Sequence, residues 1–418
     1  MNILILGSGG REHSLAWAFA QNPKCERLVI APGNAGMEAL GTCVTLDIND
    51  GAAVVALAQA EAIDLVVVGP EAPLVAGVAD VVRDAGITCF GPSRAAAQLE
   101  ASKQFTKEVC TACGAPTAAS AYFESLEPAL AYLQAQGAPI VIKADGLAAG
   151  KGVTVAEDLE TAEFALRAVF DGSFGPGAAV VIEERMTGEE ASLFVLCDGV
   201  TALPCGTAQD HKRAFDGDVG PNTGGMGAYS PAPIADEALV ARAMAEIVEP
   251  SLAEMARRGS PFQGVLYVGL MIENGAPRLV EYNVRFGDPE CQVLMMRLGG
   301  QALDLVQACA EGRLADMQVH WAEDHAMTVV MAAKGYPGAY AKGAVLAGLD
   351  ARMEGTTVFH AGTARDGDHV VTSGGRVLGV TARGPSLQAA RDLAYERLEK
   401  VDWPDAMFRT DIGWRALQ

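Results

Sequence analysis

Four short apolar runs in the first 90 residues constrain the fold of this 418-residue chain more than any other feature of its sequence. Each has the length and β-branched content of a strand: Asn2–Leu6, Arg27–Ile30, Leu65–Val68 and Thr88–Phe90. Segments of helical character lie between them: Ser14–Gln21, Gly51–Gln59 and Val75–Ala85. Strand–helix alternation of this kind builds a parallel sheet with helices on both faces. The N-terminal part is therefore predicted to be an α/β domain.

Glycine-containing loops follow all four predicted strands, at residues 7–10, 31–36, 69–73 and 91–93. Open α/β sheets bind ligands at the carboxyl ends of their strands, so we expect these loops to face one crevice. The first loop resembles a dinucleotide fingerprint, but Glu12 stands in place of the third glycine and no acid closes the second strand. An NAD site is therefore disfavoured, although a glycine turn that opens a helix can still bind phosphate through free N–H groups. A plain tight turn explains the same residues equally well.

The rest of the chain divides into three further segments. The first has strands around a glycine-rich turn: Pro139–Lys143, Gly152–Val155 and Ala179–Glu183, with a helix at Asp158–Phe170. The second has longer strands, at Ser192–Cys197, Val265–Ile272 and Arg278–Tyr282. Asn274-Gly275 between the last two predicts a hairpin. A small α/β unit is expected after about Trp321, with strands at Ala326–Ala332, Thr357–His360 and Val377–Thr381 and a helix at Ser386–Lys400.

Composition excludes several classes of function. A formal net charge of −21 disfavours a nucleic-acid surface, although a few basic side chains can still hold a small anion. No apolar stretch approaches the ~18 residues of a membrane helix, and no targeting segment precedes the first strand, so we expect a cytoplasmic protein. Nine scattered cysteines predict reduced thiols instead of a zinc site. The oligomeric state stays open, with a monomer as the simplest expectation.

The segment Gly146–Gly152 resembles a P-loop without matching it. Asp145 stands where that motif needs Gly, Gly152 where it needs Ser or Thr, and a strand follows in place of a helix. We interpret the segment as a turn between antiparallel strands whose N–H groups can contact polyphosphate, with Lys143 adding a point charge. The alternative is a flexible hairpin tip, which the position of Lys143 at the end of so apolar a strand disfavours.

The apolar strand that begins at Val180 ends in paired acids, Glu183-Glu184. Backbone groups at such a strand end can contact adenine, and a carboxylate can contact ribose hydroxyls; Glu189 or Glu190 could supply it instead. A solvated strand end explains the same residues, and taken alone it is the preferred interpretation.

Glu281 and Asn283 lie two residues apart in a predicted strand. Alternation places them on one face, with Val280 and Tyr282 on the other. A carboxylate and an amide oxygen suit Mg²⁺, which takes one or two protein groups plus substrate phosphates. The run that follows, Arg285-Phe286-Gly287-Asp288-Pro289-Glu290, joins a cation, a turn and two acids and strengthens the prediction of a functional site.

Two further segments, 209–213 and 221–231, combine polar residues and glycines as functional loops do. His211 in the first is a candidate base, although a single histidine is more often a hydrogen-bonded structural residue.

Taken in order, these segments resemble the phosphoribosylamine–glycine ligases, also called glycinamide ribonucleotide synthetases. The resemblance covers the chain from end to end, through Gly9–His13, Ala31–Gly36, Val68–Leu74, Ile142–Gly152, Asp210–Arg213, Gly220–Pro231, Arg285–Glu290 and Asp411–Arg415. The run Arg285–Glu290 is close to a family signature, which makes the resemblance more specific than any single motif.

This resemblance implies an ATP-grasp fold. Its parts would be an N-terminal parallel-sheet α/β substrate domain (1–118), an α+β ATP-binding part made of a lid (119–186) and a body (187–325), and a small C-terminal α/β domain (326–418). It also implies a reaction in purine biosynthesis. ATP would phosphorylate the carboxylate of glycine, and the amine of 5-phosphoribosylamine would displace phosphate. Mg²⁺ or Mn²⁺ would neutralise phosphate charge in the cleft.

The resemblance further implies the roles of individual residues. The metal ligands would be Glu281 and Asn283. ATP would contact Lys103, Lys143, Gly150, Gly152, Glu183, Glu184, Glu189 and Glu190. Catalysis would involve Arg285, Lys143, Asp210 and Lys212. The substrates would contact Gly9, Gly10, Arg11, Glu12, Asn34, Gly225, Gly227, Arg285, Gly287, Asp288, Ser373, Gly374, Gly375 and Arg376.

One departure from the wider superfamily concerns the metal. Many ATP-grasp enzymes carry another acidic ligand on the neighbouring strand, but Tyr267–Ile272 has none and Glu273 lies at the turn. The number of metal ions therefore stays open. The chain ends soon after Trp414, which predicts an enzyme with a single activity.

Three alternatives are weighed against this interpretation. Another ATP-grasp carboxylate–amine ligase is disfavoured by the Arg285–Glu290 run and the tail. An NAD-dependent oxidoreductase lacks a complete fingerprint. A non-catalytic nucleotide-binding module would have lost Lys143, Glu281 or Asn283, which are all present.

Overall fold

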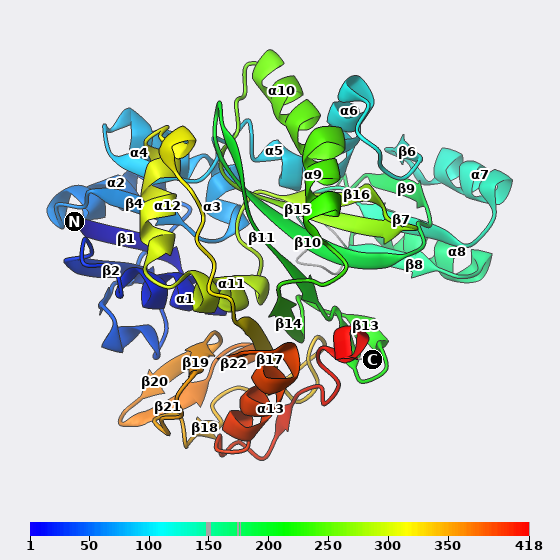
Figure 1. The fold of residues 1–418 in the computed structure, drawn as a ribbon. Helices are drawn as coiled ribbons and strands as arrows, with labels where there is room; N and C mark the ends of the chain where they lie inside the picture. Colours follow the sequence, from blue (N-terminus) through cyan, green and yellow to red (C-terminus); the bar gives the residue numbers. More distant parts are fainter. Residues whose placement is uncertain (148–151, 174, 176, 418) are drawn as a thin grey trace.

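A computed structural model describes residues 1–147, 152–173, 175 and 177–417. The N-terminal residues form a parallel sheet in the order β3-β2-β1-β4-β5, which confirms the predicted α/β domain (Figure 1). Its strands are β1 (Asn2–Gly7), β2 (Arg27–Pro32), β3 (Thr42–Cys43), β4 (Leu65–Val68) and β5 (Thr88–Phe90). Its helices are α1 (Gly10–Phe19), α2 (Gly51–Ala60), α3 (Glu71–Ala76) and α4 (Val78–Asp84).

Two details of the N-terminal domain differ from the prediction. The expected helix Val75–Ala85 is divided into α3 and α4, because Gly77 takes a φ of 88° and ends the first helix in a left-handed conformation. Strand β3 has only two residues, which is too short for an apolar run to reveal.

Helices α5 (Gln98–Ala101) and α6 (Lys103–Cys113) lead from this domain into the lid. Ser102 begins α6 by accepting a hydrogen bond from the Phe105 N–H at 3.1 Å. The lid is an antiparallel sheet in the order β6-β9-β7-β8, with two helices. Its elements are β6 (Ser120–Phe123), α7 (Leu126–Gln136), β7 (Ile140–Ala144), β8 (Val153–Ala156), α8 (Leu159–Ala168) and β9 (Val180–Glu184).

A long sheet in the order β16-β15-β10-β11-β14-β17-β22-β19 joins the body to the C-terminal domain (Figure 1). Its strands are β10 (Glu189–Asp198), β11 (Ala202–Asp210), β14 (Gly227–Ser230), β15 (Gln263–Glu273), β16 (Ala276–Asn283), β17 (His325–Ala333), β19 (Thr356–His360), β22 (Arg376–Gly384) and β23 (Ala406–Met407), the last of which pairs with β17. The predicted boundary at 325/326 therefore lies where one sheet continues, since β14 pairs with β11 and β17.

The remaining elements cover this sheet or stand at its edges. The helices are α9 (Glu237–Ala243), α10 (Glu249–Arg257), α11 (Glu290–Leu298), α12 (Gln301–Ala310) and α13 (Leu387–Leu398). A short hairpin pairs β12 (Arg213–Phe215) with β13 (Val219–Asn222), and a small sheet pairs β18 (Val345–Leu346), β21 (His369–Thr372) and β20 (Thr363–Asp366). The hairpin predicted at Asn274-Gly275 joins β15 to β16, and both residues have the positive φ that its turn needs.

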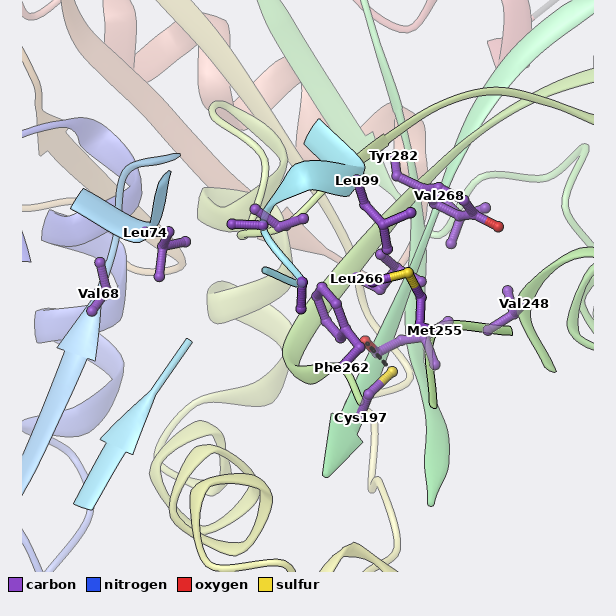
Figure 2. Close-up of a cluster of buried hydrophobic side chains, with 14 of the residues drawn as sticks. Val68, Leu74, Leu99, Cys197, Val248, Met255, Phe262, Leu266, Val268 and Tyr282 are labelled. Atoms are coloured by element: carbon purple, nitrogen blue, oxygen red, sulfur yellow. Dashed lines mark hydrogen bonds between the residues drawn. The ribbon is translucent and has the colours of Figure 1, made fainter. Parts of the chain in front are cut away.

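One hydrophobic cluster joins the N-terminal domain to the body. Val68 on β4 and Leu74 on α3 come from the N-terminal domain. Phe262 lies just before β15, and Leu266 and Val268 lie on it; all five side chains are buried (Figure 2). Because the same cluster packs against both units, it holds the carboxyl ends of the parallel strands beside the body sheet.

Among the described residues, no helix is long and apolar enough to cross a membrane. Every cysteine lies within the described part of the chain and has a free thiol, as the scattered spacing predicts.

Replacement of Phe262 by alanine tests the contribution of this cluster. Phe262 is 1 % exposed, so Phe262→Ala removes buried apolar area and leaves a cavity, which costs about 3–5 kcal/mol of unfolding free energy. Phe164→Ala is the matched control, because Phe164 is 76 % exposed and its loss changes stability by about 0.5 kcal/mol or less. Urea unfolding measures the unfolding free energy of both variants. Equal losses of unfolding free energy would contradict the assignment of Phe262 to the core.

Candidate active site

A cavity of about 840 Å³ lies where the N-terminal domain, the lid, the body and the C-terminal domain meet. Many predicted site residues line it: Arg11, Lys103, Lys143, Gly152, Glu183, Glu184, Glu190, Asp210, Lys212, Glu281, Asn283, Arg285, Gly287, Asp288 and Arg376. Residues almost 370 positions apart in the sequence thus share one cavity.

Lys143 enters the cavity from the lid strand β7, all of whose residues are buried. Its ammonium group lies 2.7 Å from Glu183 Oε2 and donates to the Val280 carbonyl at 3.2 Å. Lys107, on α6, lies 3.0 Å from the other oxygen of Glu183. The Glu183 carboxylate is therefore buried between two lysines and serves to position them. The predicted adenine contact at this strand end would fall to backbone groups.

Lys103 stands one turn before Lys107 on α6. The Asp145 carboxylate accepts from the Lys103 N–H at 2.6 Å, and the Lys103 ammonium group donates to the Gly146 carbonyl at 2.9 Å. Burial lowers the pKa of Lys103, and the Glu281 and Asp145 carboxylates oppose this shift. The beginning of the glycine-rich turn is thus attached to α6. Gly150, predicted to contact ATP, lies outside the described residues.

Glu281 and Asn283 both line the cavity. Tyr282 between them also borders it, but its side chain is buried and its hydroxyl donates to Ser251 at 2.8 Å. A register shift between β15 and β16 leaves Val280 without a partner in the ladder, and the Val280 carbonyl is the one that Lys143 binds. Two oxygen-bearing side chains on one strand can hold a hard cation when a ligand supplies the remaining oxygens.

Among the described residues, no group of three or more His, Cys, Asp and Glu side chains is arranged to hold a metal ion. The Glu281–Asn283 pair fits a cation that is bound mainly by its ligand, because such a cation needs few protein groups. The Asn283 side-chain oxygen already accepts from Arg285 at 3.0 Å, which fixes its direction.

Arg285 is held by carboxylates from the N-terminal half of the chain. It lies 3.3 Å from Glu71, at the start of α3, and 2.8 Å from Glu100, on α5. Burial lowers the pKa of Arg285, but the Glu100 and Glu71 carboxylates outweigh it and the pKa is raised. Glu100 also accepts from the Val284 N–H at 2.7 Å. The guanidinium is therefore charged and fixed at the junction of the two units.

Four charged side chains, Glu190, Asp210, Lys212 and Glu290, gather where β10 begins, β11 ends and α11 begins. Lys212 lies 2.6 Å from Glu190, and although burial lowers the pKa of Lys212, the Glu190 and Asp210 carboxylates raise it well above its usual value. Burial, opposed by Lys212, raises the pKa of Asp210. Burial and the Asp210 carboxylate raise the pKa of Glu290 to about 7. Among the described residues, no basic group lies within 4.0 Å of Glu290, which leaves this carboxylate open to a cationic ligand.

Another end of the cavity is formed by Arg11, Asp288 and Arg376. Arg11 donates its N–H to Asp288 at 3.2 Å and its guanidinium to the Phe286 carbonyl at 3.2 Å. Arg376, from the C-terminal domain, lies 3.5 Å from Asp288 and donates to the Gly224 carbonyl at 2.5 Å. Three parts of the chain thus contribute to one cationic corner.

Several predicted site residues do not line the cavity: Gly9, Gly10, Glu12, Asn34, Glu189, Gly225, Gly227, Ser373, Gly374 and Gly375. Glu12 accepts from the Gly9 N–H at 2.7 Å and pairs with Arg11, so it caps α1. Asn34 donates to the Ser8 and His360 carbonyls at 2.8 and 2.9 Å and so joins the N-terminal domain to the C-terminal one. Their direct substrate roles remain predictions.

His211 does not enter the cavity. It is buried, and its Nε2 accepts from the Gly413 N–H at 2.9 Å. The structure therefore favours the structural interpretation of this histidine over a role as a base.

Sequence reasoning did not assign roles to Glu71, Glu100, Lys107 and Glu290, which all line the cavity. Lys107 follows Lys103 by four residues, and this i, i+4 spacing is the local signal that could have identified it. Glu290 belongs to the Arg285–Glu290 run, and Glu71 lies in the loop 69–73 that was expected to face the crevice. Glu100 gave no signal, because its partner Arg285 lies far away in sequence.

The described residues that line the cavity include eight Lys and Arg side chains and nine carboxylates. The whole chain has a formal charge of −21, so the cavity is far less acidic than the protein around it. A polyanionic ligand that brings its own cation can therefore enter.

The fold and this cavity together define an ATP-grasp protein, a class that uses ATP together with a divalent metal ion. A solved biotin carboxylase from Campylobacter jejuni shares the fold, with a TM-score of 0.74 at 15% sequence identity over 97% of this chain and 92% of that one. At this identity the likeness concerns the fold alone.

Three family models match successive parts of the chain: the phosphoribosylglycinamide synthetase N domain at residues 1–100, the ATP-grasp (A) domain at 101–291 and the C domain at 326–415. The chain belongs to the phosphoribosylglycinamide synthetase family. A phosphoribosylamine–glycine ligase of Mesorhizobium japonicum is 58% identical, and one of Vibrio cholerae 52%, each over 100% of this chain and 99% of the relative. The crystal structure of the ligase from Thermotoga maritima has a TM-score of 0.86 at 33% identity, covering 98% of this chain and 100% of that one.

Replacement of Glu290 by glutamine tests the electrostatics of the cavity. The pKa of Glu290 is about 7, against 4.5 for an ordinary Glu, so the folded protein retains a proton that the unfolded chain loses in this window. Stability from this group is present below pH 4.5 and is lost as pH rises through about 7. Wild type should therefore lose up to about 1.4 kcal/mol per pH unit in this window relative to Glu290→Gln, which stays neutral.

Urea unfolding at about pH 5 and about pH 8 measures this loss. Glu396→Gln is the control, because Glu396 is exposed and outside the cavity. If the difference in unfolding free energy between wild type and Glu290→Gln does not change with pH, the raised pKa of Glu290 is contradicted.

Proposed function

We propose that this protein joins glycine to 5-phosphoribosylamine, with cleavage of ATP to ADP and phosphate, to form glycinamide ribonucleotide. The observation that carries the proposal is one shared cavity, in which Lys143 of the lid, the lysines of α6, a carboxylate–amide pair and a cationic corner of Arg11 and Arg376 come together. Full-length relatives with the name phosphoribosylamine–glycine ligase support this choice of substrates.

ATP is assigned to the space between lid and body. Lys143 and Lys103 supply positive charge for its phosphates, and Glu183 positions Lys143 by holding it within 2.7 Å. Free backbone groups at the end of β9 are assigned to adenine, because the Glu183 side chain is bound to two lysines and the Glu184 N–H already donates to the Ala119 carbonyl at 2.9 Å. Glu190 lines the cavity and Glu189 does not, so Glu190 is the carboxylate assigned to the ribose.

Glu281 and Asn283 are assigned to a divalent metal ion, Mg²⁺ or Mn²⁺. When bound, the ion would neutralise negative charge on the phosphates and so favour their attack by another anion. Asn283 keeps its orientation through the hydrogen bond from Arg285.

Phosphoryl transfer forms the first step. A carboxylate oxygen of glycine attacks the γ-phosphorus of ATP, the bond to the β-phosphate oxygen breaks, and glycyl phosphate and ADP result. Arg285 is half-buried, charged and fixed by Glu71 and Glu100, so it can stabilise negative charge on the transferred group without reorganising.

The second step is acyl transfer to the amine. The nitrogen of 5-phosphoribosylamine attacks the carbonyl carbon of glycyl phosphate, phosphate leaves and the nitrogen loses one proton. We assign the ammonium group of glycine to the half-buried Asp210 and the buried Glu290, because two neighbouring carboxylates with raised pKa values favour a cationic ligand. Phosphoribosylamine is assigned to Arg11, Asp288 and Arg376, where guanidinium groups suit its phosphate and the carboxylate suits its hydroxyls.

Release of ADP from ATP and Mg²⁺ tests the proposal, with glycine and phosphoribosylamine omitted in turn and the labile amine made in situ. ADP release should require both substrates. Glu281→Ala should lower kcat on the order of 10²-fold or more, because it removes a ligand of the metal ion that would neutralise negative charge in the transition state. Glu273→Ala is the matched control, since this nearby acid does not line the cavity and should retain activity. ADP release with other acids or amines, but not with glycine and phosphoribosylamine, would contradict the choice of substrates.

A further inference from the structure

The C-terminal tail lies against a part of the site that is almost 200 residues away in sequence. The tail contains Asp411–Arg415 and the short helix η5 (Trp414–Leu417), and it lies beside β13 and β14 (Figure 1). The motif in the tail belongs to the family resemblance, but none of the roles assigned above explains it.

Arg409 is the centre of this contact. Its guanidinium is fully buried and binds both oxygens of Asp411, at 2.7 and 2.8 Å, and Asp218 in the β12–β13 turn, at 2.7 Å. Asp411 in turn accepts from the Gly217 N–H at 2.8 Å. The Thr410 N–H donates to Asp216, also at 2.8 Å. Every residue of the turn from 216 to 218 is therefore bound to the tail.

His211 is the second contact. It follows Asp210 and precedes Lys212, which both line the cavity, while its own side chain is buried and accepts from the Gly413 N–H at 2.9 Å. The backbone of His211 also binds the glycine loop, because its N–H donates to the Gly227 carbonyl at 2.9 Å and its carbonyl accepts from the Met226 N–H at 2.8 Å.

The contacts of Arg409 and of His211 both attach the segment 210–227 to the tail. Lys212 accepts from Thr223 at 2.8 Å through its carbonyl, so the strand that carries the charged pair and the loop before β14 form one unit. Ile412 packs against Gly227, where an added Cβ would lie 2.7 Å from its side chain. Among the described contacts, nothing in the tail reaches Lys103, Lys143, the Glu281–Asn283 pair or Arg285.

We infer that the tail is a clamp that positions Asp210, Lys212 and the loop 223–227 for the glycine end of the cavity. His211 and Arg409 are its positioning residues and touch no substrate. The inference rests on the proposed function, since it assigns the clamped segment to glycine. It predicts a selective effect, because Lys103, Lys143 and the Glu281–Asn283 pair are held by other elements. A smaller effect on ATP is expected through Glu190, which is assigned to the ribose and pairs with Lys212 at 2.6 Å.

Steady-state kinetics of the full chain test the clamp. The side-chain end of glutamine reaches the position of histidine Nε2 and can accept from Gly413, whereas asparagine is shorter and cannot. His211→Asn should lower kcat/KM for glycine on the order of 10²-fold, as a displacement of about 1 Å does, with the KM for ATP changed less than about 3-fold. His211→Gln should recover most of this loss.

Arg397→Met is the control for general destabilisation. Arg397 is also buried in the C-terminal domain, but it donates to the Gly348 and Leu349 carbonyls, at 3.1 and 2.9 Å, away from the clamp. Arg397→Met should lower the unfolding temperature and leave the ratio of kcat/KM for glycine to kcat/KM for ATP unchanged. Wild-type constants for His211→Asn, or equal losses for glycine and ATP, would overturn the inference.

Two further results separate the possible failures. If His211→Asn does not fold, Asp411→Asn replaces it, since it weakens the bonds to Arg409 and Gly217 without changing shape. A selective loss for glycine then supports the clamp, and wild-type constants overturn it. If wild type itself releases no ADP that depends on glycine, the proposed function fails independently of the clamp.

Discussion

The guanidinium of Arg285 is the contact on which the arrangement of the site depends. It binds Glu71 and Glu100 from the N-terminal half of the chain and Asn283 on β16, so one cation connects the substrate domain with the strand assigned to the metal. These charges are only partly exposed, so removing one partner leaves an uncompensated charge, at a cost below the ~3–5 kcal/mol typical of a fully buried pair. The hydrophobic cluster around Phe262 holds the same two units together, which lets these polar contacts act between fixed partners.

Acidic residues in the cavity serve mainly to place its cations. Glu183 holds Lys143 and Lys107, Glu190 holds Lys212, and Asp288 lies near Arg376. Each cation is thus oriented before a ligand arrives, and an entering phosphate competes with a carboxylate for it. Such preorganised charge lowers the cost of reorganisation when negative charge moves during phosphoryl transfer. It also explains how a chain with a net charge of −21 can accept polyanionic substrates.

Local patterns predicted the elements of the fold and much of the site. Strand–helix alternation predicted the parallel sheet, Asn274-Gly275 the hairpin and strand alternation the common face of Glu281 and Asn283. These features depend on near neighbours in the sequence, so a single chain reveals them.

Long-range features could not be predicted in this way. The pairing of β14 with β17, which extends the body sheet into the C-terminal domain, joins segments almost 100 residues apart. Glu100 gave no local sign of its contact with Arg285, and Asn34 and Glu12 looked like ligand groups while their side chains bind protein partners. Sequence pattern identifies polar residues near strand ends, but only the tertiary arrangement decides which of them remain free for a substrate.

The most direct test of the account follows one oxygen atom. Glycine labelled with ¹⁸O in its carboxylate should transfer one labelled oxygen to inorganic phosphate in each turnover, because the carboxylate attacks the γ-phosphorus and that oxygen leaves with the phosphate. Mass spectrometry of the phosphate measures this transfer. Singly labelled phosphate in proportion to product is the predicted result. Unlabelled phosphate, with product still formed, would contradict activation of glycine by phosphoryl transfer in this cavity.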